Sequence, residues 1–369
     1  MTKTWTGALA LGVLLAACGG GGDDAGGATP GSLKGGDAPA GTVTLTGAGA
    51  TFPYPLYSKW FETYGRSNPV RVNYQPIGSG GGIRQVTENT VDFGASDAPM
   101  TDQELASAPA TLHLPTVLGS VAVAYNLPGL AQPLKLDGAT LAALFQGGIR
   151  KWNDPRIAAL NPGVALPTTD VLPVYRTDGS GTTYVFTDYL SAVSPEWKGG
   201  PGTGKSVRWP TGLGGKGNEG VTGQVKQTPG AIGYVELAYA MQNQLPVASL
   251  KNAAGQFVSP SVEATTAAAS DLGTALQQHP DFRLSVVNAA GATAYPIASF
   301  TYLLVPQQME DCGKARALTR LVEWALTQGA AQATELHYAP LPEALRAPVL
   351  EKLRTVTCGA NREPALAAG

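Results

Sequence analysis

Three glycine-rich loops of this chain have the residue types and the spacing expected of an oxyanion site. They are Gly47–Phe52, Gly78–Gly82 and Thr177–Thr182, and each stands between an apolar strand pattern and the start of a helix pattern. A helix start leaves backbone N–H groups unpaired and carries a partial positive charge, while glycine lets a ligand approach and Ser or Thr adds a hydroxyl donor. Arg176 precedes the third loop, and Asp97 closes an apolar strand. Together these residues predict a pocket that surrounds a small oxyanion.

Asp97 bears on which oxyanion such a pocket would accept. A carboxylate repels a fully ionised anion, but it accepts a hydrogen bond from an anion that still carries a proton. Phosphate keeps a proton at neutral pH and sulfate does not, and a site built around such a bond can reject an analogue lacking it by about 10⁴–10⁵-fold. The alternative is a helix cap, because Asp97 precedes Ala98-Pro99 and Asp is a common cap. The residues by themselves leave both interpretations open.

Arg176 and Asp178 form a second charged pair in the same region. A guanidinium offers a planar fork of donors to phosphate oxygens, and Asp178 could hold that fork in place. An ordinary surface ion pair is the alternative, although the Gly-rich bend favours the site. Ser180 is interpreted as a hydrogen-bond donor rather than a nucleophile, because no histidine lies near it in the sequence to act as a base. A histidine close in space stays an open alternative.

One segment matches a nucleotide-binding formula without the context that gives the formula meaning. Gly199–Ser206 fits G-x-x-x-x-G-K-[ST], which binds phosphates only between a buried strand and a helix. The preceding Ser194–Lys198 is not an apolar strand, and Pro210 with its neighbouring glycines forbids a sustained helix. We therefore expect a surface loop here rather than an ATP site.

The N-terminus indicates an exported protein held at a membrane. Residues 1–17 join Lys3 to a short apolar run, the pattern of a signal peptide. Leu15–Cys18 resembles the lipobox of bacterial lipoproteins, in which Cys18 would carry the lipid; a plain signal peptide is the alternative. Residues 18–41 are rich in Gly, Asp, Ala and Pro and predict a flexible linker. The expected location is the periplasm or the cell surface.

Composition sets further limits. The net charge of −2 at pH 7 argues against a nucleic-acid partner, which normally leaves a basic footprint. In an exported protein Cys312 and Cys358 suggest a disulfide, with two free thiols as the alternative. The three histidines are scattered without the spacing of metal ligands, so neither a metal site nor a cofactor is expected.

Strand and helix patterns alternate along the body of the chain, which indicates an α/β fold. The predicted strands are 70–77, 91–96, 117–125, 171–176, 231–235 and 300–305, and the predicted helices are 82–89, 140–145, 183–190 and 314–328. The candidate anion residues follow the carboxyl ends of strands, where open α/β sheets bind ligands, and they come from both sides of the 117–125 strand. The pocket is therefore expected between two lobes that close by hinge motion.

Whole motifs, and not only single residues, resemble the PstS-type phosphate-binding proteins of bacterial ABC importers. The matching segments are 46–60, 74–83, 91–99, 151–155, 176–182, 214–220 and 230–234. The resemblance extends from about Val43 to Thr357 and implies a two-lobed, type II-like periplasmic-binding-protein fold. Its expected parts are lobe 1 (42–118 plus 294–358), lobe 2 (119–293) and a C-terminal tail (359–369).

The resemblance also implies the residues of the site. The expected phosphate-binding residues are Ala50, Thr51, Phe52, Ser79, Asp97, Arg176, Ser180, Gly181 and Thr182, with Asp178 orienting the arginine. Gly80 departs from close relatives, which often carry a second Ser there. The implied protein is a monomeric receptor, not an enzyme. It binds inorganic phosphate and delivers it to the membrane subunits of an ABC permease with a cytoplasmic ATPase. A receptor for sulfate or molybdate and an exported phosphatase using Ser180 are the alternatives.

Overall fold

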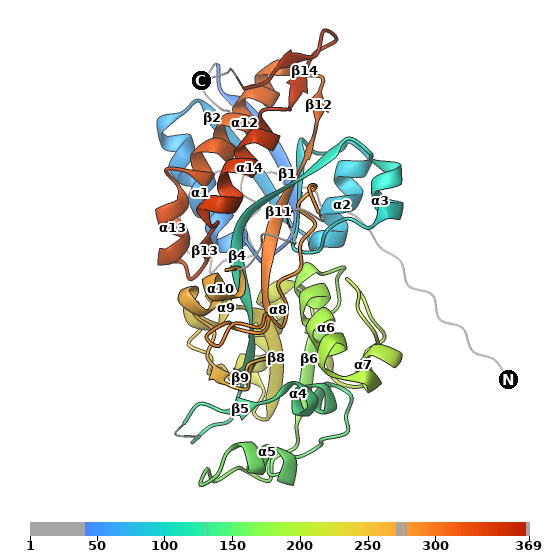
Figure 1. Ribbon diagram of the computed structural model, residues 1–369, viewed down its shortest axis with the longest axis vertical. Helices are drawn as coiled ribbons and strands as arrows, with labels where there is room; N and C mark the ends of the chain where they lie inside the picture. Colours follow the sequence, from blue (N-terminus) through green and yellow to red (C-terminus); the bar gives the residue numbers. More distant parts are fainter. Residues whose placement is uncertain (1–40, 131, 271–275, 277–278, 367–369) are drawn as a thin grey trace, which may run out of the picture. The chain divides into compact units, whose positions relative to one another are not determined.

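A single nine-stranded mixed sheet organises the computed structural model, which describes residues 41–130, 132–270, 276 and 279–366. Its strand order is β2-β1-β3-β11-β4-β8-β6-β7, with β13 also paired to β4 (Figure 1). The strands are β1 (Val43–Gly49), β2 (Val70–Pro76), β3 (Phe93–Ser96), β4 (Thr111–Tyr125), β6 (Leu172–Arg176), β7 (Leu213–Gly215), β8 (Ala231–Glu236), β11 (Ala298–Pro306) and β13 (Ala339–Pro340). The predicted α/β class is confirmed.

Helices separate most of these strands along the chain. They are α1 (Tyr54–Ser67), α2 (Ser79–Thr87), α3 (Asp102–Ser107), α4 (Gly138–Phe145), α5 (Pro155–Leu160), α6 (Gly181–Val193), α7 (Pro195–Gly199), α8 (Gly217–Gln227), α9 (Leu237–Gln242), α10 (Val262–Ala268), α12 (Cys312–Leu326), α13 (Ala330–Glu335) and α14 (Glu343–Leu353). In α12, Leu318, Leu321 and Val322 are buried at helical spacing, and the Asp311 side chain caps the first turn. None of the helices in the described ranges is both long and apolar enough to span a membrane.

The long strand β4 joins two sections of the sheet. Its first part, Thr111–Ser120, pairs with β11, and its last part, Val121–Tyr125, pairs with β8. One section therefore contains β1, β2, β3 and β11, and the other contains β6, β7 and β8, with β4 common to both (Figure 1). Below, these are called the β1 section and the β6 section.

The sequence predicted β4 only from residue 117, whereas the strand begins at Thr111. Pro115 and His113 interrupt the apolar pattern there. The strand nevertheless continues because its register with β11 shifts between Thr301 and Tyr302, opposite Pro115. An irregular position of this kind tolerates a residue that has no N–H to donate.

Two small sheets complete the fold. They are β10 (Phe257–Val258) with β9 (Ser249–Lys251) and β5 (Lys135–Leu136), and β12 (Gln308–Met309) with β14 (Thr357–Cys358) and β15 (Glu363–Pro364). The second begins just before α12 and ends inside the expected C-terminal tail. Ala365 is 3% exposed, and its N–H donates to the Val356 carbonyl. The segment expected as the C-terminal tail therefore contains the short strand β15 and ends, in the described residues, on the buried Ala365 and Leu366.

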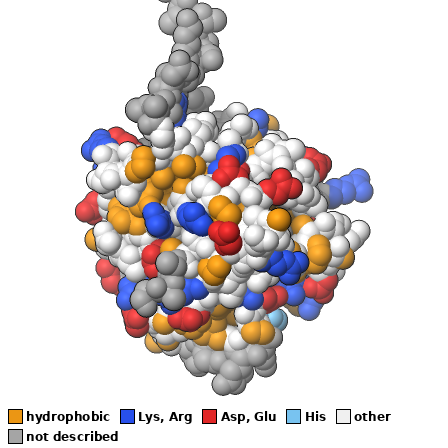
Figure 2. All heavy atoms as spheres, turned by 90° about the horizontal axis from the view of Figure 1, so that it is seen from above, with side chains coloured by type: hydrophobic (Ala, Val, Ile, Leu, Met, Phe, Trp, Pro, Cys, Tyr) orange, Lys and Arg blue, Asp and Glu red, His pale blue; other side chains and the backbone are white. Residues whose placement is uncertain are grey.

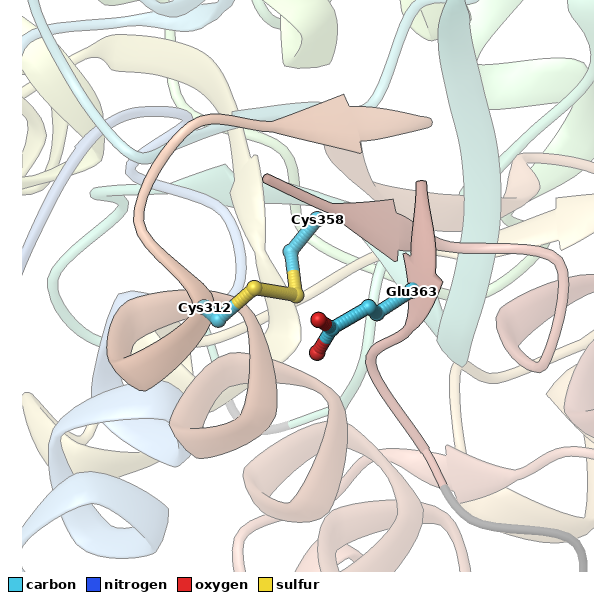
Figure 3. A group of neighbouring side chains, drawn as sticks. All are labelled: Cys312, Cys358 and Glu363. Atoms are coloured by element: carbon cyan, nitrogen blue, oxygen red, sulfur yellow. A yellow bond between two sulfur atoms is a disulfide. The ribbon is translucent and has the colours of Figure 1, made fainter. Parts of the chain in front are cut away.

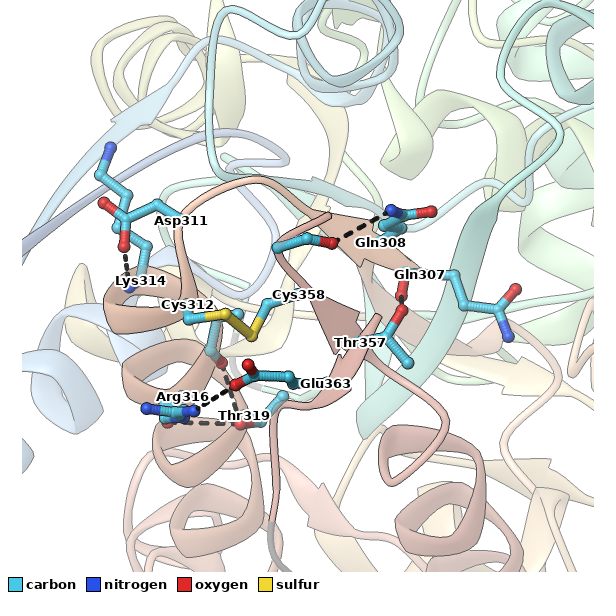
Figure 4. Close-up of a disulfide and its surroundings, with 12 residues drawn as sticks. Gln307, Gln308, Asp311, Cys312, Lys314, Arg316, Thr319, Thr357, Cys358 and Glu363 are labelled. Atoms are coloured by element: carbon cyan, nitrogen blue, oxygen red, sulfur yellow. Dashed lines mark hydrogen bonds and ion pairs between the residues drawn. A yellow bond between two sulfur atoms is a disulfide. The ribbon is translucent and has the colours of Figure 1, made fainter. Parts of the chain in front are cut away.

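A disulfide joins Cys312, at the start of α12, to Cys358 in β14 (Figure 4). Glu363 of β15 lies beside the two sulfur atoms (Figure 3) and pairs with Arg316 at 3.1 Å (Figure 4). Two Cys and one Glu can hold a metal ion only if the two cysteines are free thiolates. Because these sulfurs are bonded to each other, the cluster is a covalent link between helix and strand rather than a metal site.

Charged side chains are mixed on the face that Figure 2 shows. Lys and Arg side chains alternate with Asp and Glu side chains there, without a continuous basic stripe. The residues before 41, including Cys18 with the expected signal peptide and linker, lie outside the described part of the chain.

Candidate functional site

The three glycine-rich loops converge where the strands of the two sections end. Strands β2 and β3 both run parallel to β1, while β7 and β8 run parallel to β6. The loops from the two sections touch directly: Gly80 N–H donates to the Gly179 carbonyl at 2.9 Å, and Gly181 N–H donates to Ser79 Oγ at 3.0 Å. Six polar residues at this junction are buried, namely Thr51, Ser79, Asp97, Arg176, Ser180 and Thr182.

Asp97 follows the last residue of β3 and points into this junction. Thr301 Oγ1, from β11, donates to Asp97 Oδ1 at 2.8 Å. Burial raises the pKa of Asp97 to about 7, although the hydrogen bond from Thr301 and the charge of Arg176 act against that rise. The side chain that caps α3 belongs to Thr101, so the cap interpretation of Asp97 is wrong.

Gly181 permits the close approach of Asp97 and Ser79. Any side chain at position 181 would place its Cβ 2.5 Å from Asp97 Oδ2 and 2.5 Å from Ser79 Oγ, well inside van der Waals contact. Ser79 Oγ accepts from Asp97 N–H at 3.2 Å as well as from Gly181 N–H. A hydroxyl has two acceptor lone pairs and one proton, so Ser79 has only its proton left, and it can donate that proton to the Asp97 carboxylate or to a ligand.

Arg176 ends β6, and its guanidinium is fixed on two sides. Its Nε donates to Asp178 Oδ1 at 2.8 Å, and its Nη2 pairs with Asp178 Oδ2. The Nη1 atom donates to Thr182 Oγ1 at 3.1 Å. Asp178 Oδ1 also accepts from Gly217 N–H at 3.0 Å. Burial raises the pKa of Asp178, but the hydrogen bonds and charge of Arg176 outweigh it and hold that pKa below its ordinary value.

The Arg176–Asp178 pair is not a surface ion pair. The exposed fractions of the two side chains are 1% and 11%. A buried pair with this bidentate geometry keeps the guanidinium charged and rigid. It therefore presents a fixed positive charge beside Asp97, as an anion site requires.

The backbone donors of the first and third loops are only partly available. Ala50 N–H donates to the Ala95 carbonyl, Ser180 N–H to the Lys205 carbonyl, and Gly181 N–H to Ser79. Within the described residues, the N–H groups of Thr51, Phe52 and Thr182 have no protein acceptor. These last three N–H groups are available to a ligand, while those of Ala50 and Gly181 donate within the protein.

Ser180 is placed as a cap rather than as a nucleophile. Its Oγ accepts from Thr183 N–H at 3.0 Å at the start of α6. No hydrogen bond joins Ser180 to a histidine in the part of the chain that the structure describes. His113 is buried elsewhere, where its Nε2 accepts from Met100 N–H and burial lowers its pKa to about 4.

The P-loop-like segment is a loop, as predicted. It begins where α7 ends, and neither a strand before it nor a helix after it frames it. Lys205 of this segment donates to both carboxylate oxygens of Glu104 in α3, at 2.7 and 2.8 Å. The lysine thus links the segment to the β1 section.

Three residues of the site were not singled out from the sequence. They are Thr301, which bonds Asp97, Tyr234, whose hydroxyl accepts from Arg176 N–H at 3.1 Å, and Asn218, which bonds Thr51 and Thr182. Each belongs to a strand or helix distant in sequence from the loop it contacts. For Asn218 and Tyr234 a signal existed, because they stand in the motifs 214–220 and 230–234.

Comparison with known proteins places the chain in a family. A family model described as a PBP superfamily domain matches residues 35–328. The phosphate-binding protein PstS of Pasteurella multocida is 48% identical over 301 residues, which cover 81% of this chain and 87% of that protein. The chain belongs to the PstS family of phosphate-binding proteins. A PstS of Xylella fastidiosa is 47% identical over 305 residues and covers 82% of this chain and 83% of its own.

Solved structures agree on the fold. The phosphate-bound high-affinity periplasmic phosphate-binding protein PfluDING superposes with a TM-score of 0.67 at 24% identity, covering 83% of this chain and 93% of that one. The phosphate-binding protein of Stenotrophomonas maltophilia gives a TM-score of 0.66 at 22% identity, covering 84% and 94%. The two-lobed periplasmic-binding-protein fold expected from the motifs is confirmed.

Proposed function

We propose that this protein is an extracytoplasmic receptor that binds inorganic phosphate selectively and delivers it to an ABC phosphate permease. The observation that carries the proposal is the buried carboxyl of Asp97 beside Arg176 and other hydrogen-bond donors. Arg176, the Ser79 hydroxyl and the open N–H groups of Thr51 and Phe52 would bind the anion's oxygens. Asp97 would accept a hydrogen bond from the proton that phosphate retains and sulfate lacks. The names of the PstS relatives support the same ligand.

The substitution Asp97→Asn tests this division of roles. An amide can donate to a fully deprotonated oxyanion, so the variant should discriminate less between phosphate and sulfate than the parent does. Competition of unlabelled sulfate against labelled phosphate in equilibrium dialysis measures that ratio for both proteins. A variant that rejects sulfate as strongly as the parent would show that Asp97 is not the proton acceptor.

The lobes are proposed as 42–118 plus 294–358 and 119–293, with phosphate closing the cleft between them. The change of β4 pairing between Ser120 and Val121 supports the first boundary. The bonds Gly181–Ser79 and Lys205–Glu104 cross between these lobes, as in a closed form. Small-angle scattering with and without phosphate tests the motion, and an unchanged radius of gyration would contradict it.

The proposal extends to the location and the partners. Residues 1–17 would be removed, Cys18 would carry a lipid, and residues 18–41 would tether a monomeric receptor to the membrane beside the permease subunits and their cytoplasmic ATPase. We further propose binding without turnover, because the Ser180 hydroxyl caps a helix and no carboxylate or histidine of the described residues hydrogen-bonds it. Release of phosphate from a chromogenic ester, lost on Ser180→Ala, would overturn that part.

A further inference from the structure

Asn218 lies fully buried between the two threonines of the site. It is the second residue of α8, and it has no exposed surface. Its Nδ2 donates to Thr51 Oγ1 at 2.8 Å and to Thr182 Oγ1 at 3.3 Å, and its backbone N–H donates to Thr51 Oγ1 at 3.2 Å. Thr51 follows β1, whereas Thr182 follows β6. One carboxamide therefore contacts both sections of the sheet.

The orientation of this carboxamide is determined by its other end. Asn218 Oδ1 accepts from the backbone N–H of Glu236, the last residue of β8, at 2.9 Å. A flipped amide would set its NH₂ group against that N–H, with two donors facing each other in a buried place. The NH₂ group must therefore face the threonines.

The fixed NH₂ group restricts what the two hydroxyls can do. Thr51 Oγ1 accepts from both nitrogens of Asn218, and Thr182 Oγ1 accepts from Asn218 Nδ2 and Arg176 Nη1. Two acceptor lone pairs are then occupied on each oxygen, so each hydroxyl can only donate its proton. Without Asn218, either hydroxyl could instead present a lone pair, which repels an anion.

We propose that Asn218 is a positioning residue that commits the Thr51 and Thr182 hydroxyls to donate to the bound anion. The inference rests on the proposed function and adds a residue to it. Because Thr51 and Asn218 lie in different proposed lobes, Asn218 can hold the Thr51 hydroxyl as a donor only when the cleft closes. Closure would thereby complete the set of donors around the acceptor Asp97.

The isosteric substitution Asn218→Asp reverses the polarity of these bonds. It keeps an acceptor for Glu236 N–H, but its carboxylate accepts from the threonine hydroxyls that should donate to phosphate. Calorimetry should show the phosphate Kd rising by at least about 100-fold, and Thr51→Val alone should raise it by about tenfold. In the double variant the factor by which the phosphate Kd rises should be at least about fivefold smaller than the product of the two single factors. The reason is that the contribution which Asn218 makes through the Thr51 hydroxyl can be lost only once.

The double-mutant cycle separates positioning from the added charge. Repulsion between Asp at position 218 and phosphate persists when Thr51 is replaced, so it cancels from the coupling energy between the two substitutions. Single increases in Kd that simply multiply in the double variant would overturn the inference. Asn218→Ala in the same cycle adds no charge; it should give a smaller loss with coupling of the same sign. The cycle with Asn218→Ala also tests the inference if the Asn218→Asp variant does not fold.

A matched control and the parent complete the test. Asn161 is buried outside the site, and its Nδ2 donates to the Lys135 and Ile157 carbonyls. Asn161→Asp should leave the phosphate Kd within about twofold of the parent's; a loss equal to that of Asn218→Asp would contradict the inference. A parent that binds no phosphate would overturn the proposed function itself, whereas a binding parent with multiplicative losses would overturn only the role of Asn218.

Discussion

Replacing Asp97 by Asn should change how the stability of the ligand-free protein depends on pH. In the unfolded chain Asp97 ionises near its ordinary pKa of 3.8, whereas burial raises the pKa in the folded protein to about 7. Between these values the folded protein binds more protons than the unfolded one. The free energy of unfolding therefore falls as pH rises through this window and levels off above pH 7.

The magnitude follows from the separation of the two pKa values. Each pH unit between them corresponds to about 1.4 kcal/mol, so ionising Asp97 in the folded protein costs about 4 kcal/mol at pH 8. Asn cannot ionise, so Asp97→Asn removes this cost. The difference in the free energy of unfolding, variant minus parent, should therefore be up to about 4 kcal/mol larger at pH 8 than at pH 4.

Urea unfolding of phosphate-free parent and variant, followed by fluorescence from pH 4 to pH 8.5, measures the difference directly. Other ionisable groups titrate alike in both proteins and cancel from it. A difference that does not change with pH would show that the carboxyl of Asp97 ionises as readily in the fold as in water. That result would show that burial does not raise the pKa of Asp97 in the folded protein.

Three further substitutions probe the site, the fold and the anchor. Arg176→Ala should raise the phosphate Kd by about 10- to 100-fold, as expected for a charge-assisted bond, and calorimetry showing no change would mean that other donors hold the anion. Cys358→Ser should lower the free energy of unfolding by about 4 kcal/mol in the chain-entropy model, because the bridge to Cys312 spans 46 residues, with phosphate affinity unchanged. Denaturant unfolding with equal midpoints in both proteins would refute this estimate. Cys18→Ser should move the protein from the membrane to the soluble fraction; equal membrane association of parent and variant would contradict lipidation.

The local patterns of the sequence predicted the glycine-rich loops, six of the strands and four of the helices, whereas other elements, such as α8, α10 and α14, were not predicted. Glycine-rich bends predicted where β2 and β6 end, and Asp97-Ala98-Pro99 predicted the end of β3. The same loops supplied the candidate residues Asp97 and Arg176. Strand β4 was predicted too short, since Pro115 breaks the pattern and only the irregular pairing with β11 explains its tolerance.

Contacts between distant segments could not be predicted in the same way. Thr301 stands in an apolar strand, and nothing in its neighbourhood shows that its hydroxyl meets Asp97 across more than 200 residues of chain. Asn218 orients its amide through Glu236 and meets Thr51 at a separation of 167 residues. Such partners are chosen by sheet order and loop convergence, which are properties of the folded chain.

Selective binding of phosphate is the central claim, and isothermal titration calorimetry of the phosphate-stripped protein tests it most directly. The donors around Arg176 and the acceptor Asp97 predict one phosphate per chain and sulfate affinity at least about 10⁴-fold weaker. Sulfate that binds as tightly as phosphate, or a protein that binds neither ion, would contradict the account.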